Sequence, residues 1–375
     1  MSMSNRQPPL YEQIKSHLVS EMNSQRLQPH DKLPPENELS REFSVSRITV
    51  KKALADLVKA GRIYRIQGKG TFVADFPPKT FQTEPKRKPA VAVLLPYMNN
   101  QHTALLLNGV ERVLSEAGYS LLFANTENDQ TKEEQKIRDM VEQGVCGLIV
   151  YPVDGESYNR EILQLTLDSF PLVVMDRYLR GIDTNFVCTD NFKGAREGTA
   201  YLISLGHRHI GFISTRVDNT SSVEDRLAGY ERALADHQIP IDHRYRIVDF
   251  EHEGSKEERI KSFLLNNPEM TAIFAVNAGL GLQVMKYAAE LGIRVPEELS
   301  LIFFDDFELS EFYSVRPTYI SQDEKSLGME AARLLISMME QPAKRKNKLF
   351  LPPKLIVRES TAPAKTRLRS PYAGL

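Results

Sequence analysis

Residues 46–54 read SRITVKKAL, and residues 67–73, a little further along the chain, read QGKGTFV. In the first of these stretches the apolar residues recur every three or four positions, which is the spacing of one face of a helix. That face continues beyond residue 54 and consists of Val50, Ala53, Leu54, Leu57 and Val58. The opposite face is basic at its N-terminal end, and Gly61 is placed to end the helix. We therefore expect a short helix that buries one side and presents cations on the other.

Two further helices are expected upstream of this one. The first has an apolar stripe at helical spacing, formed by Tyr11, Ile14, Leu18 and Met22. Pro29 interrupts this pattern, and Pro35 is suited to the first turn of a second helix that runs to about Phe43. Residues 44–46 then make a tight turn into the basic helix. This order of elements is that of a helix-turn-helix.

A β-hairpin is expected after the basic helix. Its strands, Ile63–Ile66 and Thr71–Val73, are separated by Gln67-Gly68-Lys69-Gly70, whose two glycines allow a thin tip. A basic helix on its own is more often a solvated surface of a small helical domain than a nucleic-acid site. Here the helices, the turn, the basic face and the glycine tip all occur in the order of a winged helix-turn-helix, which favours DNA binding.

This order of motifs resembles the DNA-binding segment of GntR-type bacterial regulators over residues 10–75. The resemblance implies that the third helix enters the major groove by its N-terminal end, where Arg47 can pair with guanine and Thr49 can reach a base edge or the backbone. The lysines that follow suit phosphates, and the hairpin tip suits the minor groove. The residues expected to contact double-stranded operator DNA are Asn37, Ser46, Arg47, Thr49, Lys51, Lys52, Gln67, Gly68 and Lys69.

Length and charge indicate that this module is only one part of the chain. The chain has 375 residues and a net charge of −1, yet residues 1–90 carry 16 Lys and Arg against 9 Asp and Glu. A basic module on an acidic body suits nucleic acid at one end only. We expect a DNA-binding domain at residues 1–75, a linker at 76–89 and a sensing domain at 90–375. The linker has four prolines, which favour an extended tether over a basic DNA-binding arm.

From residue 91 onward, short apolar runs alternate with amphipathic helical patterns. This alternation predicts an α/β fold with doubly wound parallel sheets, and the number of repeats predicts two lobes with a cleft at the strand C-termini. The expected strands are 91–95, 120–124, 147–151, 172–175, 210–214, 246–249, 272–276 and 299–303. The expected helices include 104–117, 131–143, 193–205, 225–235 and 282–291.

Several motifs in this region resemble those of the LacI and periplasmic-binding-protein-like sensors, over about residues 90–360. They include Asn108-Gly109-Val110-Glu111, Glu116-Ala117-Gly118-Tyr119, Met175-Asp176-Arg177, Thr189-Asp190-Asn191, Arg226-Leu227-Ala228-Gly229-Tyr230, Phe304-Asp305-Asp306 and Ser321-Gln322. A GntR-type head joined to a LacI-type sensor is the combination found in the arabinose repressors of Gram-positive bacteria. The resemblance implies a transcriptional repressor that a small neutral sugar, L-arabinose, releases from its operator.

Polar residues follow several of the expected strands, where the cleft should lie. A sugar offers hydroxyl groups that both donate and accept, which carboxylates, amides and a guanidinium can match. The positions that match sugar-binding positions of the family are Asp176, Arg226, Asn277, Asp305 and Gln322. Tyr97 in the first strand-to-helix loop joins this set, and Asn99 and His102 of the same loop are secondary candidates.

Two residues near the ends of expected strands, Asp190 and Arg226, have structural alternatives to a place in the cleft. Asp190 either faces the cleft or caps the helix that follows it. Arg226, on a helix face, could instead form half of a surface ion pair. His207 and His209 lack a zinc-ligand pattern, and Cys146 and Cys188 lie in apolar runs, so all four are expected to be structural. Neither a metal nor a cofactor is expected.

Other functional classes are weighed against this one. The sequence has no Gly-x-Ser-x-Gly elbow, no Walker loop, no His-Glu-x-x-His and no dinucleotide fingerprint, so an enzyme is not expected. A regulator of the same plan that senses another sugar, a nucleoside, an amino acid or a phosphorylated sugar stays open. A palindromic operator favours a homodimer, joined through the sensing domain. No apolar run approaches the roughly 20 residues that span a bilayer, so we expect a cytoplasmic protein without a membrane partner.

Overall fold

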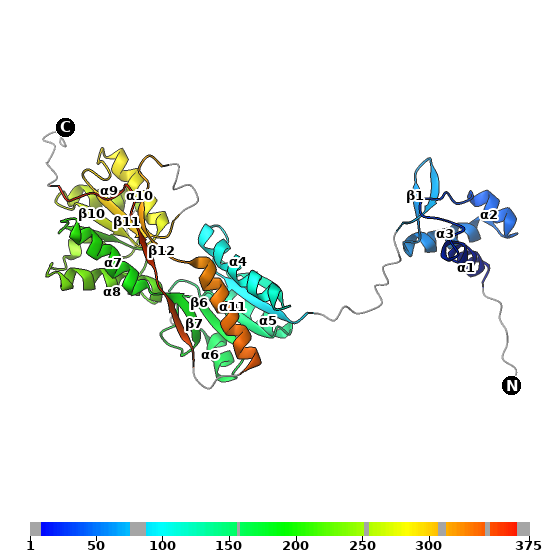
Figure 1. Cartoon of the computed structure of the whole chain (residues 1–375), viewed down its shortest axis with the longest axis horizontal. Coiled ribbons are helices and arrows are strands. Elements are labelled where there is room, and N and C mark those ends of the chain that lie inside the picture. The colour runs from blue at the N-terminus through cyan, green and yellow to red at the C-terminus, as the bar shows by residue number, and fades with distance from the viewer. Residues whose placement is uncertain are drawn as a thin grey trace. The chain divides into compact units, whose positions relative to one another are not determined.

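The computed structural model of the chain describes residues 9–75, 88–155, 158–250, 255–306, 313–341 and 346–365. These residues belong to two separate units, residues 1–87 and residues 88–375 (Figure 1). Of the predicted linker, residues 76–87 lie outside the described residues. Among the described residues, no helix combines the length and the apolar character that crossing a membrane requires.

The N-terminal unit is the predicted winged helix-turn-helix. Its elements are α1 (Leu10–Asn23), α2 (Glu36–Glu42), α3 (Arg47–Lys59), β1 (Ile63–Ile66) and β2 (Gly70–Val73). The predicted apolar face of α3 is buried at Val50, Ala53, Leu54 and Leu57, which pack with Ile14 of α1 and Leu39 of α2. Val58, which the sequence placed on this face, is exposed because it lies in the last turn of α3, beyond the packed core. Pro35 immediately precedes α2 rather than lying in its first turn. The strands pair antiparallel, from Ile63 opposite Val73 to Ile66 opposite Gly70.

Short-range interactions fix where α3 and the hairpin begin and end. The Ser46 hydroxyl caps α3 by accepting a hydrogen bond from the Thr49 amide at 3.2 Å. Gly68 forms the hairpin tip with a φ of +75°, a left-handed conformation that a residue with a side chain rarely adopts. The ring of Tyr64 on β1 stacks on Phe72 of β2, 5.7 Å between centroids. These contacts fix the start of α3 and the shape of the wing.

The sensor unit consists of two lobes, each built on a six-stranded sheet. The first sheet has the strand order β13-β7-β6-β5-β3-β4, and all its neighbours are parallel. Its elements are β3 (Ala90–Leu95), α4 (Gln101–Glu116), β4 (Ser120–Asn125), α5 (Gln130–Glu142), β5 (Gly147–Val150), α6 (Arg160–Leu167), β6 (Leu172–Asp176), β7 (Asn185–Thr189), α11 (Glu324–Glu340) and β13 (Lys348–Leu351).

Strand β3 shows why this sheet is covered on both faces. Its residues Val91, Val93 and Leu95 pack with α4 and α11, whereas Ala92 and Leu94 pack on the other face with α5 and α6. All five side chains are fully buried. A strand buried on both faces reads as a continuous apolar run, as this stretch of sequence does.

The second lobe repeats the arrangement with the strand order β14-β12-β11-β10-β8-β9, in which only β14 is antiparallel. Helices α7 and α8 pack against each other, and α9 contacts α10. The elements are α7 (Asn191–Ser204), β8 (Ile210–Ile213), α8 (Ser221–Asp236), a 3-10 turn (His243–Tyr245), β9 (Arg246–Ile247), α9 (Lys256–Asn266), β10 (Ala272–Ala275), α10 (Ala278–Glu290), β11 (Ser300–Phe304), β12 (Thr318–Ser321) and β14 (Lys354–Ile356).

The chain passes between the lobes three times, between β7 and α7, between β12 and α11, and between β13 and β14. Figure 1 shows the result most clearly at α11, drawn in orange, which returns to the first lobe and lies beside α4. Hydrogen bonds also join the lobes. The Tyr178 amide donates to the Ser221 hydroxyl at 2.9 Å, and Arg180 forms an ion pair with Asp225 at 3.0 Å.

The predicted strands were largely found, with one reduced and four missed. The strand expected at 246–249 covers only Arg246–Ile247. The strands β7, β12, β13 and β14 were not among those expected, because each mixes polar with apolar residues instead of forming a continuous apolar run. Their pairing is decided by neighbours far away in the sequence, such as Leu349 of β13 beside Val187 of β7.

Glycines allow α4 and α11 to approach closely. A Cβ atom added to Gly328 of α11 would lie 2.1 Å from the Leu106 carbonyl oxygen, and one added to Gly109 of α4 would lie 2.2 Å from the Lys325 carbonyl oxygen. Both obstacles are backbone atoms, which cannot move unless the helices separate. The contact therefore requires glycine at both positions.

We predict that Gly328→Ala lowers the thermal unfolding midpoint of the sensor unit by about 2 to 5 °C, because overpacking a core typically costs about 1–3 kcal/mol. Circular dichroism of the full chain measures the change. Gly279→Ala in the first turn of α10 is the matched control, since its Cβ would meet only the Asn277 side chain at 3.4 Å. Equal midpoints for the two variants would contradict the close packing of α4 against α11.

Candidate effector-binding cleft and nucleic-acid interface

Two aspartates occupy equivalent places at the carboxyl ends of strands in the two lobes. Asp176 is the last residue of β6 and Asp305 directly follows β11, each the fourth strand counted from the β4 or β9 edge of its sheet. Both have a left-handed backbone, with φ of +73° and +72°. Non-glycine residues in this region are uncommon, and aspartate is among those that tolerate it. Each turn directs a carboxylate into the space beyond its sheet, as predicted from the sequence.

His102, near the start of α4, is held between two carboxylates. Its Nε2 lies 2.6 Å from Asp176 Oδ1, and its Nδ1 lies 3.5 Å from Glu324 Oε1 at the start of α11. The His102 side chain is 15% exposed and that of Asp176 is 6% exposed. Asp176 comes from the sequence prediction, His102 was a secondary candidate, and Glu324 was not predicted.

This arrangement shifts the pKa values of both His102 and Asp176. Burial acts to lower the pKa of His102, but the charge of Asp176 and hydrogen bonds to Asp176 and Glu324 outweigh it and raise the pKa to about 10. Burial acts in the opposite direction on Asp176, yet protonated His102 and then Arg177 hold the pKa of that carboxyl below its usual range. At neutral pH the pair is therefore an imidazolium and a carboxylate.

Arg226 supplies the buried cation of the second lobe. It is 7% exposed, and its Nε donates to Asn191 Oδ1 at 2.8 Å while its Nη1 donates to the Val276 carbonyl at 2.7 Å. The guanidinium lies 3.8 Å from the centre of the Phe304 ring. Burial lowers its pKa, and the charges of Asp305 and Asp176 oppose that effect. The alternative of a surface ion pair is therefore wrong.

The remaining candidates of the second lobe have defined roles. Gln322 donates from Nε2 to Asp305 Oδ1 at 2.6 Å and is 5% exposed. The Asn277 side chain caps α10 by accepting from the Leu280 amide at 2.9 Å. The structure thus gathers Asp176, Arg226, Asp305 and Gln322 into one connected cluster with His102 and Glu324, and it places Asn277 next to Val276 at the edge of that cluster.

The centre of the cluster brings the two lobes within ligand distance. His102 and Glu324 of the first lobe and Asp305 of the second each offer one ligand atom, and these atoms all lie within 4.8 Å of one another. Among the described residues this is the group that could hold a metal ion. The same three groups can also accept from, or donate to, the hydroxyls of a polyol that bridges the lobes.

Tyr97 belongs to a second network in the first lobe, beside the cluster. Its hydroxyl donates to Asp154, which also accepts from Arg177 Nη1 at 2.5 Å. Arg177 in turn donates to the Tyr151 hydroxyl at 3.1 Å, and its Nε lies 3.9 Å from Asp176. Burial and the charge of Asp154 raise the pKa of Tyr97, so its hydroxyl stays protonated. The network supports the position of Asp176.

Sequence reasoning missed Glu324, Arg177, Tyr151 and Asn191, although two of these stood inside motifs already quoted. Arg177 follows Asp176, and Asn191 follows Asp190. The signal that could have found them is a charged or amide residue adjoining an apolar strand. Glu324 carried no such signal, because the crossing of α11 to the first lobe is not visible locally.

Several other residues have structural roles. Asp190 caps α7 by accepting from the Lys193 amide at 2.9 Å. His207 is buried between the Thr271 hydroxyl at 2.8 Å and the Ala362 carbonyl at 3.0 Å, which is a structural role. Both cysteines are free thiols, with Cys188 buried and Cys146 partly exposed.

The predicted DNA-contacting residues form an exposed face of the N-terminal unit. All nine are exposed except Thr49, which is partly buried. The Ser46 and Thr49 hydroxyls lie 2.8 Å apart and serve the helix start. Lys52 lies 4.2 Å from the centre of the Tyr11 ring of α1, which holds its charge near the recognition end of α3. Gln67, Gly68 and Lys69 occupy the tip of the wing.

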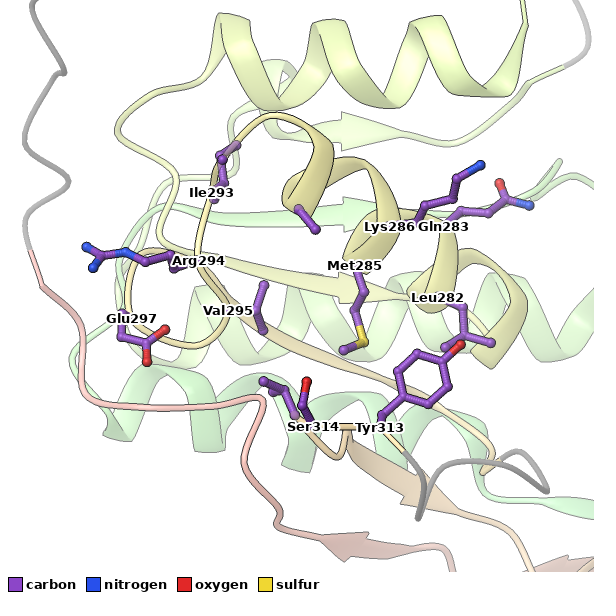
Figure 2. A pocket seen from close by; sticks show the side chains of 13 residues that line it. Leu282, Gln283, Met285, Lys286, Ile293, Arg294, Val295, Glu297, Tyr313 and Ser314 are labelled. Carbon is purple, nitrogen blue, oxygen red and sulfur yellow. The ribbon is translucent and has the colours of Figure 1, made fainter.

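The sensor unit also carries an apolar groove that is lined by none of the cleft residues. It lies along α10 and the segment 313–315 and has a volume of about 810 Å³. Figure 2 shows Leu282 and Met285 of α10 pointing toward Tyr313, with Arg294 and Glu297 at the other end. An exposed apolar surface of this kind can mark a contact with another protein.

Comparison with known proteins agrees with both units. Residues 10–73 match the bacterial regulatory proteins of the gntR family, and residues 199–361 match the periplasmic binding protein-like domain. A solved structure of a LacI family transcriptional regulator from Enterococcus faecium, with bound ribose, is 26% identical with a TM-score of 0.63, and the match covers 74% of this chain and 100% of that one.

Two relatives match almost end to end. An arabinose metabolism transcriptional repressor from Geobacillus stearothermophilus is 33% identical over 96% of this chain and 99% of its own length. A repressor of the same name from Halalkalibacterium halodurans is 32% identical over 95% of this chain and 97% of its own length. The protein is therefore a DNA-binding regulator rather than an enzyme, and it belongs to the family of the arabinose metabolism transcriptional repressors.

Proposed function

We propose that this chain represses transcription as a homodimer on a palindromic operator and is released from the DNA by a small neutral sugar, L-arabinose. The observation that carries the proposal is the polar cluster of buried Asp176, Arg226 and Gln322 with the partly buried Asp305, which draws residues from both lobes. A ligand that contacts both lobes stabilises one angle between them. That preference is the differential affinity which a switch requires.

The charges in the cluster favour a neutral ligand. Asp176, Asp305 and Glu324 stand against His102, Arg226 and Arg177, and Arg177 is also paired with Asp154, so cations do not outnumber carboxylates. A phosphorylated sugar needs several cations or amide donors for its phosphate and would meet carboxylates here. A sugar hydroxyl, which both donates and accepts, satisfies both kinds of group. We therefore assign Tyr97, Asp176, Arg226, Asn277, Asp305 and Gln322 to sugar binding.

The family supports L-arabinose as the first effector to test, because the relatives that match nearly end to end are arabinose repressors. The solved relative with bound ribose makes another pentose the alternative. A nucleoside or phosphosugar sensor of the same plan is the more distant one.

The operator would be read by two copies of the N-terminal unit in the cytoplasm. We assign the contacts with DNA to Asn37, Ser46, Arg47, Thr49, Lys51, Lys52, Gln67, Gly68 and Lys69, and the contact between copies to the groove along α10. A two-fold interface must be self-complementary. The groove suits such a contact, since its centre is apolar and Arg294 and Glu297, which carry opposite charges, lie together at one end.

The sugar assignment predicts a thermal shift. At a concentration about 100 times its dissociation constant, L-arabinose should stabilise the protein by about 2.7 kcal/mol and raise the midpoint by about 5 °C. Differential scanning fluorimetry of the full chain against pentoses, hexoses, phosphosugars and nucleosides measures it. Asp305→Ala should abolish the shift, whereas Asp168→Ala, an exposed residue beyond α6, should keep it.

The outcomes of this panel separate the parts of the proposal. A shift with another sugar instead of L-arabinose, lost in Asp305→Ala, would contradict L-arabinose as the effector. It would support the cleft as the binding site. If no sugar shifts the midpoint, the assignment of the cleft to sugar binding is wrong. The assignment of the N-terminal unit to DNA binding does not depend on this result. L-Arabinose should also weaken operator binding by fluorescence anisotropy, and a strengthened complex would contradict release.

The buried pair predicts a pH dependence. The pKa of His102 is higher in the folded protein, at about 10, than its unfolded value of 6.5. Its contribution to the free energy of unfolding is therefore fully present below pH 6.5 and is lost as the pH rises toward 10. NMR of the ring should show His102 protonated at pH 8. A His102 midpoint near pH 6.5 would contradict the ion pair.

The groove predicts the dimer interface. Ala289→Arg, on the exposed face of α10 in the groove, should convert the dimer to a monomer and weaken operator binding. Light scattering after gel filtration measures the mass. Ala235→Arg, at an exposed position of α8, is the matched control and should remain dimeric. A dimeric Ala289→Arg protein with a normal operator affinity would place the contact elsewhere.

A further inference from the structure

Ile48 is the most exposed large apolar side chain of the described residues, at 81%. It is the second residue of α3 and lies on the side opposite the buried face of Val50, Ala53 and Leu57. Leaving an isoleucine in water forgoes about 1.5–3 kcal/mol of burial, and a β-branched residue adds nothing to helix formation. A single exposed apolar residue is ordinary on a protein surface, so exposure by itself assigns no role. The role of Ile48 follows instead from its position on α3.

The surroundings of Ile48 are those of a base-reading side chain. Arg47 precedes it, and Lys51 and Lys52 follow at the spacing of the same helical face, all of them exposed. The hydroxyls of the two polar residues in this turn, Ser46 and Thr49, are directed at each other and cap the helix. Ile48 is therefore the outward apolar group in a first turn surrounded by cations, at the helix end that enters the major groove in this kind of domain.

We propose that Ile48 recognises the C5-methyl group of a thymine in each half of the operator. The inference rests on the proposal that α3 is the reading helix. The thymine methyl is the apolar group that base pairs display in the major groove, where the other edges offer hydrogen-bond donors and acceptors. An aliphatic side chain against one of those polar edges would leave it unsatisfied, which costs about 1–3 kcal/mol. Ile48 thus selects thymine at its position and disfavours cytosine.

The experiment separates the methyl group from the rest of the base. An operator is first selected from a random duplex pool with the full-length protein. Each thymine is then replaced by deoxyuridine, which removes the methyl group and leaves base pairing intact. Affinity is measured by fluorescence anisotropy at one fixed salt concentration, since phosphate contacts make affinity salt-dependent.

The expected result is a loss of about fourfold per replaced thymine at one symmetric position, the effect of burying one methyl group. That loss should vanish in Ile48→Ala, which should bind the thymine and deoxyuridine operators equally. Val58→Ala is the matched control, because Val58 is another exposed aliphatic residue of α3, at the opposite end of the helix. It should retain the full thymine preference.

Three results would overturn the inference, and they are distinguishable. If the deoxyuridine penalty at every position persists in Ile48→Ala, Ile48 reads no methyl group. If Ile48→Ala changes the mass of the protein or its complex but not the thymine preference, the side chain contacts protein instead. If Arg47→Ala and Ile48→Ala both leave operator affinity unchanged, the proposal that α3 reads the DNA fails as well.

Discussion

The burial of charge where the two lobes meet is the constraint on which the sensor unit depends. A buried ion without partners costs several kcal/mol, so His102, Asp176 and Arg226 are tolerable only with their partners in place. Those partners come from far apart in the sequence, and Glu324 is supplied by the helix that crosses back to the first lobe. The need for partners also makes the cluster sensitive to a ligand. A polyol can replace some of these hydrogen bonds and so change the preferred angle between the lobes.

Much of the fold could be predicted from the sequence because its signals are local. The periodicity around Val50, the glycine tip at Gly68 and the apolar run at 91–95 each depend on a few neighbouring residues. The strand-end rule then placed Asp176 and Asp305 at the cleft without any knowledge of their contacts.

The rest could not be predicted because it depends on long-range contacts. Arg226 has the same sequence appearance whether it lies on the surface or under Phe304, and only the packing of α8 against α7 decides between the two. Likewise, nothing around His102 reveals that carboxylates from β6 and α11 will enclose it.

The return of α11 to the first lobe has a consequence for how the protein is made. Leu327, Ala331 and Leu335 of α11 cover the face of the first sheet that β3 shares with α4. They are synthesised only after the strands β8 to β12 of the second lobe, which can already assemble around their own core. On a ribosome that adds about 5–20 residues per second, that apolar face stays uncovered for on the order of ten seconds. The lobe that is begun first therefore receives its covering helix only after most of the second lobe has been made, and during this interval its apolar face is open to aggregation.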